Sequence, residues 1–108
     1  MQLTLPRWYD LHAHFRQGAI MPALIGDHLK MGCAGILAMP NTKPPIAKIR
    51  KTDDLPYWSI EEYRTMLLQA GGDAFSEIII PLYLTKDTTP AMIAEGAENG
   101  LRACKYYP

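Results

Sequence analysis

The stretch RWYDLHAHFRQGAIMPALIGDHLKMGCAGILAMP, residues 7–40, predicts a strand, a helix and a second strand in succession. Residues 7–14 are expected to form the first strand, and residues 19–31 a helix that Gly32 can end. The apolar run at 34–40 has the length of a buried strand. A strand, a helix and a strand in this order are typical of parallel pairing.

The same alternation continues through the rest of the chain. Further helices are expected at 59–72 and 88–100, and further strands at 77–85 and 101–108. The long connection at 41–58 is expected to be irregular where Pro44 and Pro45 stand, because proline has no backbone donor. Because the strands are apolar nearly throughout, both faces of the sheet are expected to be covered.

Both later helices carry recognisable start signals. Ser59 and Glu62 stand three residues apart, as in a capping box, and Gly71 can close the same helix. Thr89 is the expected cap of the last helix, with Pro90 in its first turn. These signals strengthen the prediction of an α/β fold.

The composition limits the class of protein. The chain has 108 residues, 48% of them hydrophobic and 20% charged, which is typical of one globular domain. Eleven basic residues balance eleven acidic ones without a basic stripe, so we expect no nucleic-acid partner. The apolar runs are too short for a membrane span, and Cys33 and Cys104 are expected to be small buried thiols. We therefore expect a cytoplasmic protein.

Polar side chains cluster where the predicted strands end. His12 and His14 close the first strand, Asn41 follows the second, Thr85 follows the third, and Lys105 lies near the end of the fourth. The ends of parallel strands meet at one edge of a sheet, where active sites of such folds form. We therefore expect these groups to share a site.

Two histidines separated by one residue point to the same side of a strand. His12 and His14 could share a divalent metal through neutral ring nitrogens, or they could be unrelated polar residues at a strand end. In a regular strand, Asp10 and Arg16 would lie on the same face. The spacing alone leaves both interpretations open.

The other candidate residues are also ambiguous when taken singly. Arg16 could hold a carboxylate or lie free on the surface, and Asn41 could bind a ligand or cap a turn. Lys105 could be a desolvated amine within an apolar strand or an exposed lysine. His28 is expected to be a solvated surface histidine.

Four motifs together resemble the dihydroorotase family of the amidohydrolase superfamily. They are DLHAHFR (10–16), MPNTKPP (39–45), YLTKDTTP (83–90) and ACKYYP (103–108). The resemblance implies a (β/α)8 TIM barrel, of which this chain would supply the N-terminal half, about four parallel strands with intervening helices. It also implies reversible hydrolysis of dihydroorotate to N-carbamoyl-L-aspartate in pyrimidine biosynthesis.

The resemblance also assigns roles to individual residues. It implies two Zn²⁺ ions, with His12 and His14 as metal ligands and Lys105 bridging both ions as N6-carboxylysine, the carbamate formed with CO2. Arg16 and Asn41 match the residues that bind the carboxylate of the substrate. Carbamylation converts a neutral amine into an anionic bidentate ligand that two nearby cations stabilise.

The chain also departs from the family pattern. Gln17 stands where an aspartate is common, and the family's two further histidine ligands and catalytic aspartate have no counterpart here. Residues 1–108 are therefore expected to be an incomplete part of one barrel domain, with no catalytic acid or base of its own. The expected partners are the remaining half of the barrel and, in a homodimer, a second subunit.

Two alternatives stay open at this point. The substrate could be another cyclic amide, as in a hydantoinase or allantoinase, although MPNTKPP and YLTKDTTP favour dihydroorotate. The chain could also be a non-catalytic barrel homologue kept for assembly, which would bind no stoichiometric zinc. Substrate profiling and metal analysis separate these possibilities.

Residues 1–108 alone are expected to be inactive, because the remaining ligands and the catalytic aspartate are missing. The purified segment should show no hydrolysis of dihydroorotate in a turnover assay. Hydrolysis at the rate of a complete enzyme would contradict this expectation.

Overall fold

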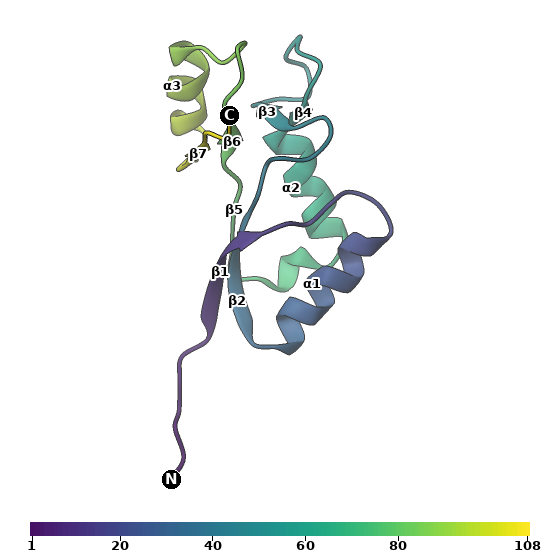
Figure 1. Cartoon of the computed structure of the whole chain (residues 1–108), viewed down its shortest axis with the longest axis vertical. Helices are drawn as coiled ribbons and strands as arrows, with labels where there is room; N and C mark the ends of the chain where they lie inside the picture. Colours follow the sequence, from purple (N-terminus) through teal and green to yellow (C-terminus); the bar gives the residue numbers. More distant parts are fainter.

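Three parallel strands form the central sheet of the computed structural model, which describes residues 1–108. The strands are β1 (Trp8–Ala13), β2 (Cys33–Ala38) and β5 (Glu77–Ile79), in the order β1-β2-β5. Both pairings are parallel, as the alternation of strands and helices predicted. Figure 1 shows β1 and β2 side by side, with the residues before β1 extending away from the body.

The prediction of one continuous strand at 77–85 is wrong. It divides into β5 and β6 (Leu82–Tyr83), and Pro81 lies in the break because it has no N–H to donate to a neighbour. β6 pairs in parallel with β7 (Cys104–Lys105), which is all of the expected strand at 101–108. One chain segment therefore pairs with β2 through its first part and with β7 through its second.

The β6–β7 ladder is short and is held by two backbone hydrogen bonds that run from β6 to β7. Leu82 N donates to the carbonyl oxygen of Ala103 at 3.0 Å, and Leu84 N donates to that of Lys105 at 2.9 Å. These two bonds fix which residues of β7 lie opposite β6.

The connection at 41–58 contains more regular structure than expected. β3 (Ile46–Lys48) pairs in parallel with β4 (Trp58–Ser59). The buried Lys48 ammonium donates to the carbonyl oxygens of Asp53 and Leu55, both at 3.1 Å. These bonds close the intervening loop around the lysine, so the connection is compact.

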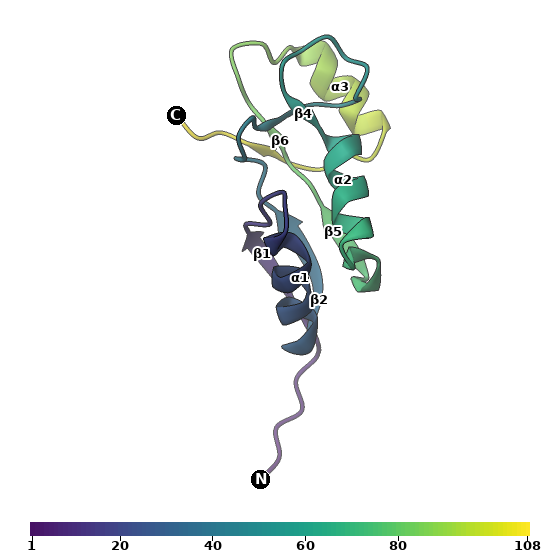
Figure 2. The ribbon, with the colours of Figure 1, turned by 90° about the vertical axis from the view of Figure 1, so that its right-hand side faces the viewer.

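Three helices accompany the strands: α1 (Ile20–Lys30), α2 (Ile60–Gln69) and α3 (Pro90–Glu98), with a short 3-10 turn η1 (Gly72–Ala74) after α2. Figures 1 and 2 show α1 and α2 on the same side of the central sheet. The capping box at Ser59 is confirmed, and so is the Thr89 cap, whose hydroxyl accepts from Met92 N at 3.2 Å. None of the helices combines the length and the apolar character needed to cross a bilayer.

The hydrophobic core lies between these two helices and one face of the sheet. Its members come from β1 and the loop after it, α1, β2, β3, α2 and the segments around η1 and β5: Ala13, Phe15, Met21, Ile25, Cys33, Ile36, Ala38, Ile46, Tyr63, Leu67, Phe75 and Ile80. The expectation that both faces of the strands are covered is wrong for β1, where Trp8, Tyr9 and Leu11 are 41%, 42% and 60% exposed. Cys33 is buried as expected, but Cys104 is exposed.

An aromatic side chain lies across the start of the sheet. The Tyr9 ring rests over Gly35, where an added Cβ would stand 2.6 Å from two ring atoms. The Tyr9 hydroxyl donates to Glu77 Oε1 at 3.0 Å, and the other oxygen of that carboxylate accepts from Arg102. Residues of β1, β5 and the segment before β7 are thus connected over a glycine of β2.

The capping box gives a testable stability effect. Burial raises the pKa of Glu62, but the hydrogen bonds from the Ser59 backbone and hydroxyl outweigh burial and leave the pKa below its ordinary value. Glu62→Ala should therefore lower the free energy of unfolding by about 1 kcal/mol at neutral pH. Because the folded-state pKa is depressed, this contribution is complete above about pH 4.5 and is lost as the pH falls through the lowered value.

Denaturant unfolding over a pH series measures the effect. Glu61→Ala is the matched control, since Glu61 lies in the same turn, is exposed and has the same charge. An equal loss in both variants, or a difference that persists in acid, would contradict the prediction.

Candidate functional site

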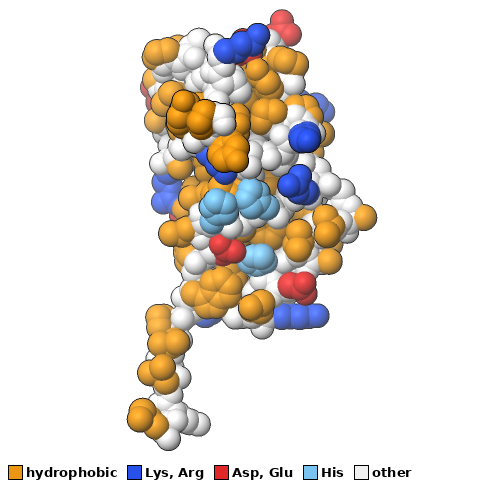
Figure 3. Space-filling view, viewed as in Figure 1, with side chains coloured by type: hydrophobic (Ala, Val, Ile, Leu, Met, Phe, Trp, Pro, Cys, Tyr) orange, Lys and Arg blue, Asp and Glu red, His pale blue; other side chains and the backbone are white.

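The histidine pair projects from the face of the sheet that the helices leave open. Ala13 and Phe15 are 3% and 1% exposed and belong to the core, so the alternating His12 and His14 point away from it. Their Nε2 atoms lie 3.1 Å apart, and their ring centroids 5.0 Å apart. The histidine side chains gather near the middle of the face shown in Figure 3.

The electrostatics keep His14 available as a ligand. Partial burial lowers the pKa of His14, and the charges of His12, Lys105 and Arg16 lower it further. The neutral imidazole, which has a free lone pair, is therefore favoured at neutral pH. Two nitrogens bound to one tetrahedral Zn²⁺ would be about 3.3 Å apart for Zn–N bonds of about 2.0–2.1 Å, and the separation of the His12 and His14 nitrogens is close to this.

Lys105 and Asn41 meet although they are 64 residues apart in the sequence. The Lys105 Nζ donates to Asn41 Oδ1 at 3.1 Å and contacts Met39 Sδ at 3.2 Å. Met39 N in turn donates to the carbonyl oxygen of Ala13, between the two histidines, at 2.8 Å. The ends of β1, β2 and β7 thus bring the amine, the amide and the imidazole pair to one region.

The segments after β1 and β2 are joined by a further contact. The Gln17 side chain donates to Thr42 Oγ1 at 3.2 Å, and that hydroxyl donates to the carbonyl oxygen of Pro44 at 2.6 Å. Arg16 precedes Gln17 and Asn41 precedes Thr42, so both candidate substrate-binding residues stand beside this bridge. Arg16 itself is exposed.

The prediction that Asp10 lies on the same face as His12 and His14 is wrong. The pairing of β1 with β2 is irregular between Asp10 and Ala13, so Asp10 leaves the face of the histidines and turns toward α1. Its Oδ2 lies 2.9 Å from His28 Nε2, and its Oδ1 accepts from His12 N at 2.9 Å. Burial raises the pKa of Asp10, but these bonds to His12 and His28 outweigh it and leave the pKa lowered.

The prediction for His28 is also wrong. It was expected to be solvated, but it is half-buried, with Nδ1 2.9 Å from the carbonyl oxygen of Leu24 and its ring 4.9 Å from the ring of Phe15. The irregularity in β1 that brings Asp10 to it left no signal in the sequence pattern. His28 supports the backbone at His12 indirectly, through Asp10.

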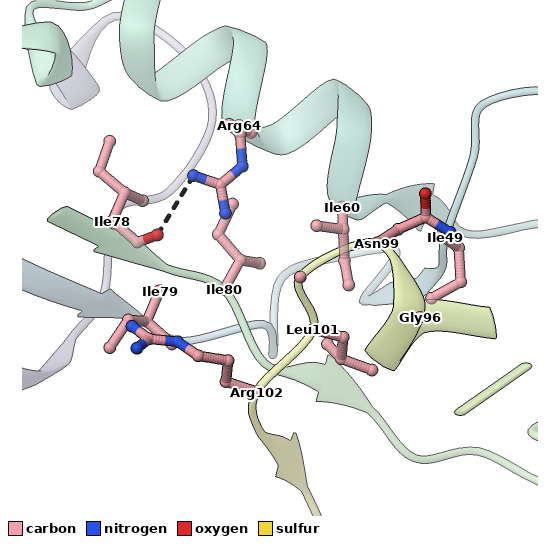
Figure 4. Close-up of a pocket in the computed structure, with 11 residues that line it drawn as sticks. Ile49, Ile60, Arg64, Ile78, Ile79, Ile80, Gly96, Asn99, Leu101 and Arg102 are labelled. Atoms are coloured by element: carbon pink, nitrogen blue, oxygen red, sulfur yellow. Dashed lines mark hydrogen bonds between the residues drawn. The ribbon is translucent and has the colours of Figure 1, made fainter. Parts of the chain in front are cut away.

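The structure contains no cluster of three or more His, Cys, Asp or Glu side chains that could hold a metal ion. A small cavity of about 70 Å³ lies elsewhere, between α2, α3 and the chain after α3, and Figure 4 shows the Arg64 guanidinium donating to the carbonyl oxygen of Ile78 at its edge. None of the residues predicted for the site lines this cavity. The site described above is therefore an exposed surface and not an enclosed pocket.

The sequence of the chain is similar to those of several known proteins. No family model matches it. The curated dihydroorotase of Mycosarcoma maydis is 34% identical over 99% of the chain, and that of Allorhizobium ampelinum is 39% identical over 98%. Over nearly its whole length the chain is similar to proteins named dihydroorotase.

Solved structures agree with this relationship. The dihydroorotase of Saccharomyces cerevisiae, solved with 5-fluoroorotic acid, superposes with a TM-score of 0.79 at 28% identity over 95% of the chain. The dihydroorotase of Campylobacter jejuni gives a TM-score of 0.71 at 22% identity, which supports the fold alone. The resemblance to dihydroorotase that the four motifs predicted is confirmed.

The chain spans about a quarter of the length of these dihydroorotases. It covers 25% of the Mycosarcoma protein, 28% of the Allorhizobium protein and 26% of the Saccharomyces chain.

Proposed function

We propose that the whole protein containing these residues is a dihydroorotase, which reversibly hydrolyses the cyclic amide of (S)-dihydroorotate to N-carbamoyl-L-aspartate. The observation that carries the proposal is the similarity to proteins named dihydroorotase along nearly the entire chain, at 34% and 39% identity. The placement of His12, His14, Asn41 and Lys105 in one region supports it. The rest of the barrel would supply the remaining ligands, and a homodimer is the proposed assembly.

Two Zn²⁺ ions are the proposed cofactors. His12 and His14 would hold metal, since their Nε2 atoms are 3.1 Å apart and the lowered pKa of His14 favours a neutral ring. Lys105 would react through its neutral amine with CO2, forming an N–C bond and releasing a proton, and the carbamate would bridge the ions. When bound, zinc supplies Lewis-acid chemistry that activates water and polarises the amide carbonyl.

The residues of this chain would also orient the substrate. The Arg16 guanidinium can hold a carboxylate through two parallel N–H bonds. Asn41 Oδ1 accepts from Lys105, which leaves the Asn41 amide protons free to donate to the same carboxylate. A carbamylated Lys105 keeps one N–H, so its bond to Asn41 is compatible with the modification.

Lys105→Gln tests the proposed function in the whole protein. Wild type should hydrolyse dihydroorotate and leave hydantoin and allantoin unchanged, and the variant should lose about a hundredfold or more in kcat/KM, because it cannot form the bridging carbamate. Lys86→Gln removes the same charge from an exposed turn and should stay active. A wild-type protein without activity on dihydroorotate, or an active Lys105→Gln variant, would refute the assignment.

Metal analysis tests the histidine ligands separately. His12→Gln should reduce the zinc retained per protein after dialysis, because it removes one ligand nitrogen. His28→Gln is the comparison variant: His28 contacts Asp10 and Leu24 and acts on His12 only through Asp10, so it should lower the retained zinc less than His12→Gln does. Equal zinc in wild type and His12→Gln, measured by mass spectrometry of the metal content, would remove His12 from the site.

A further inference from the structure

A buried tyrosine of α2 contacts the segment that carries the histidine pair. The Tyr63 hydroxyl donates to the carbonyl oxygen of Phe15 at 2.7 Å, across 48 residues of sequence. Tyr63 and Phe15 are 0% and 1% exposed. Because both side chains are enclosed by the core, the phenol is the group that satisfies this buried carbonyl.

The phenol itself is held firmly. Tyr63 lies in the second turn of α2, after the capping box at Ser59, and Leu67 one turn later is also fully buried. Burial raises the pKa of the Tyr63 hydroxyl far above its ordinary value, so the group remains protonated and remains a donor. The position of the donor is therefore set by the packing of the helix.

The carbonyl that accepts this bond belongs to the peptide group between Phe15 and Arg16. Because a peptide group is planar, holding the Phe15 carbonyl also holds the backbone nitrogen and Cα of Arg16 in that plane. On the other side, the Gln17 side chain is tied to Thr42. The exposed Arg16 is thus presented between two neighbours that are held in place, which limits the positions its guanidinium can reach.

We propose that Tyr63 is a positioning residue for Arg16, acting through the Phe15 carbonyl to aim the guanidinium at the substrate carboxylate. The inference rests on the proposed function, in which Arg16 binds that carboxylate. Tyr63 does not touch the substrate or the metal ligands. Its effect is to reduce the freedom of the backbone from which Arg16 projects.

Tyr63→Phe in the whole protein removes only the hydroxyl. KM for dihydroorotate should rise about tenfold, because the free energy that one hydrogen bond contributes to positioning Arg16 is lost. Zinc content should be unchanged, and kcat should stay within about twofold, because the reacting groups are untouched. Tyr57→Phe is the matched control: it also removes a phenol bond, from Tyr57 to Asp87 Oδ2 at 2.6 Å, and should leave KM unchanged.

A second measurement keeps the inference separate from the proposed function. The backbone amide of Arg16 shares the peptide plane with the Phe15 carbonyl, so its NMR shift and hydrogen-exchange rate should change in Tyr63→Phe and not in Tyr57→Phe. A wild type that does not hydrolyse dihydroorotate would defeat the proposed function, and the Arg16 amide would still decide whether Tyr63 positions it. The inference is overturned by an unchanged Arg16 amide, by an unchanged KM in an active enzyme, or by parallel losses of kcat, zinc and melting temperature, which mark a general structural role.

Discussion

The burial of Ala13 and Phe15 beneath the helices is the constraint on which the rest of the site depends. Side chains alternate along an extended chain, so placing these two in the core forces His12, His14 and Arg16 to the open face. The apolar residues thereby determine the direction of the polar ones. Exchanging a core residue here would therefore also move the polar side chains on the open face.

Three segments that are distant in sequence converge at the ends of β1 and β2 in the central sheet and of β7 in its ladder with β6. The β1 end supplies the imidazole pair and the β2 end supplies Asn41. β7, which pairs with β6 in a separate ladder, supplies Lys105, whose Nζ donates to Asn41 Oδ1. Backbone bonds such as that from Met39 to Ala13 hold the strand ends together. The site therefore depends on the pairing of the strands as much as on its own side chains.

The sequence patterns predict the helices and the parallel strands β1 and β2 but not the irregular contacts. The Ser59 and Thr89 caps are local signals and were placed correctly, because capping depends on neighbours within one turn. The break at Pro81 was missed, because the apolar character of the segment continues through it. Asp10 and His28 were missed for a different reason: their contact follows from an irregular pairing in β1, which only the three-dimensional register reveals.

The two-residue ladder between β6 and β7 has a consequence for accuracy of folding. A slip of one residue in this ladder would turn every β7 side chain to the opposite face, and the amine of Lys105 would then point away from Asn41. The bonds from Leu82 to Ala103 and from Leu84 to Lys105 are what distinguish the two registers. A mispaired molecule would keep its helices and most of its core, but its Lys105 amine would lie away from Asn41. Correct secondary structure alone would therefore not show that the site has formed.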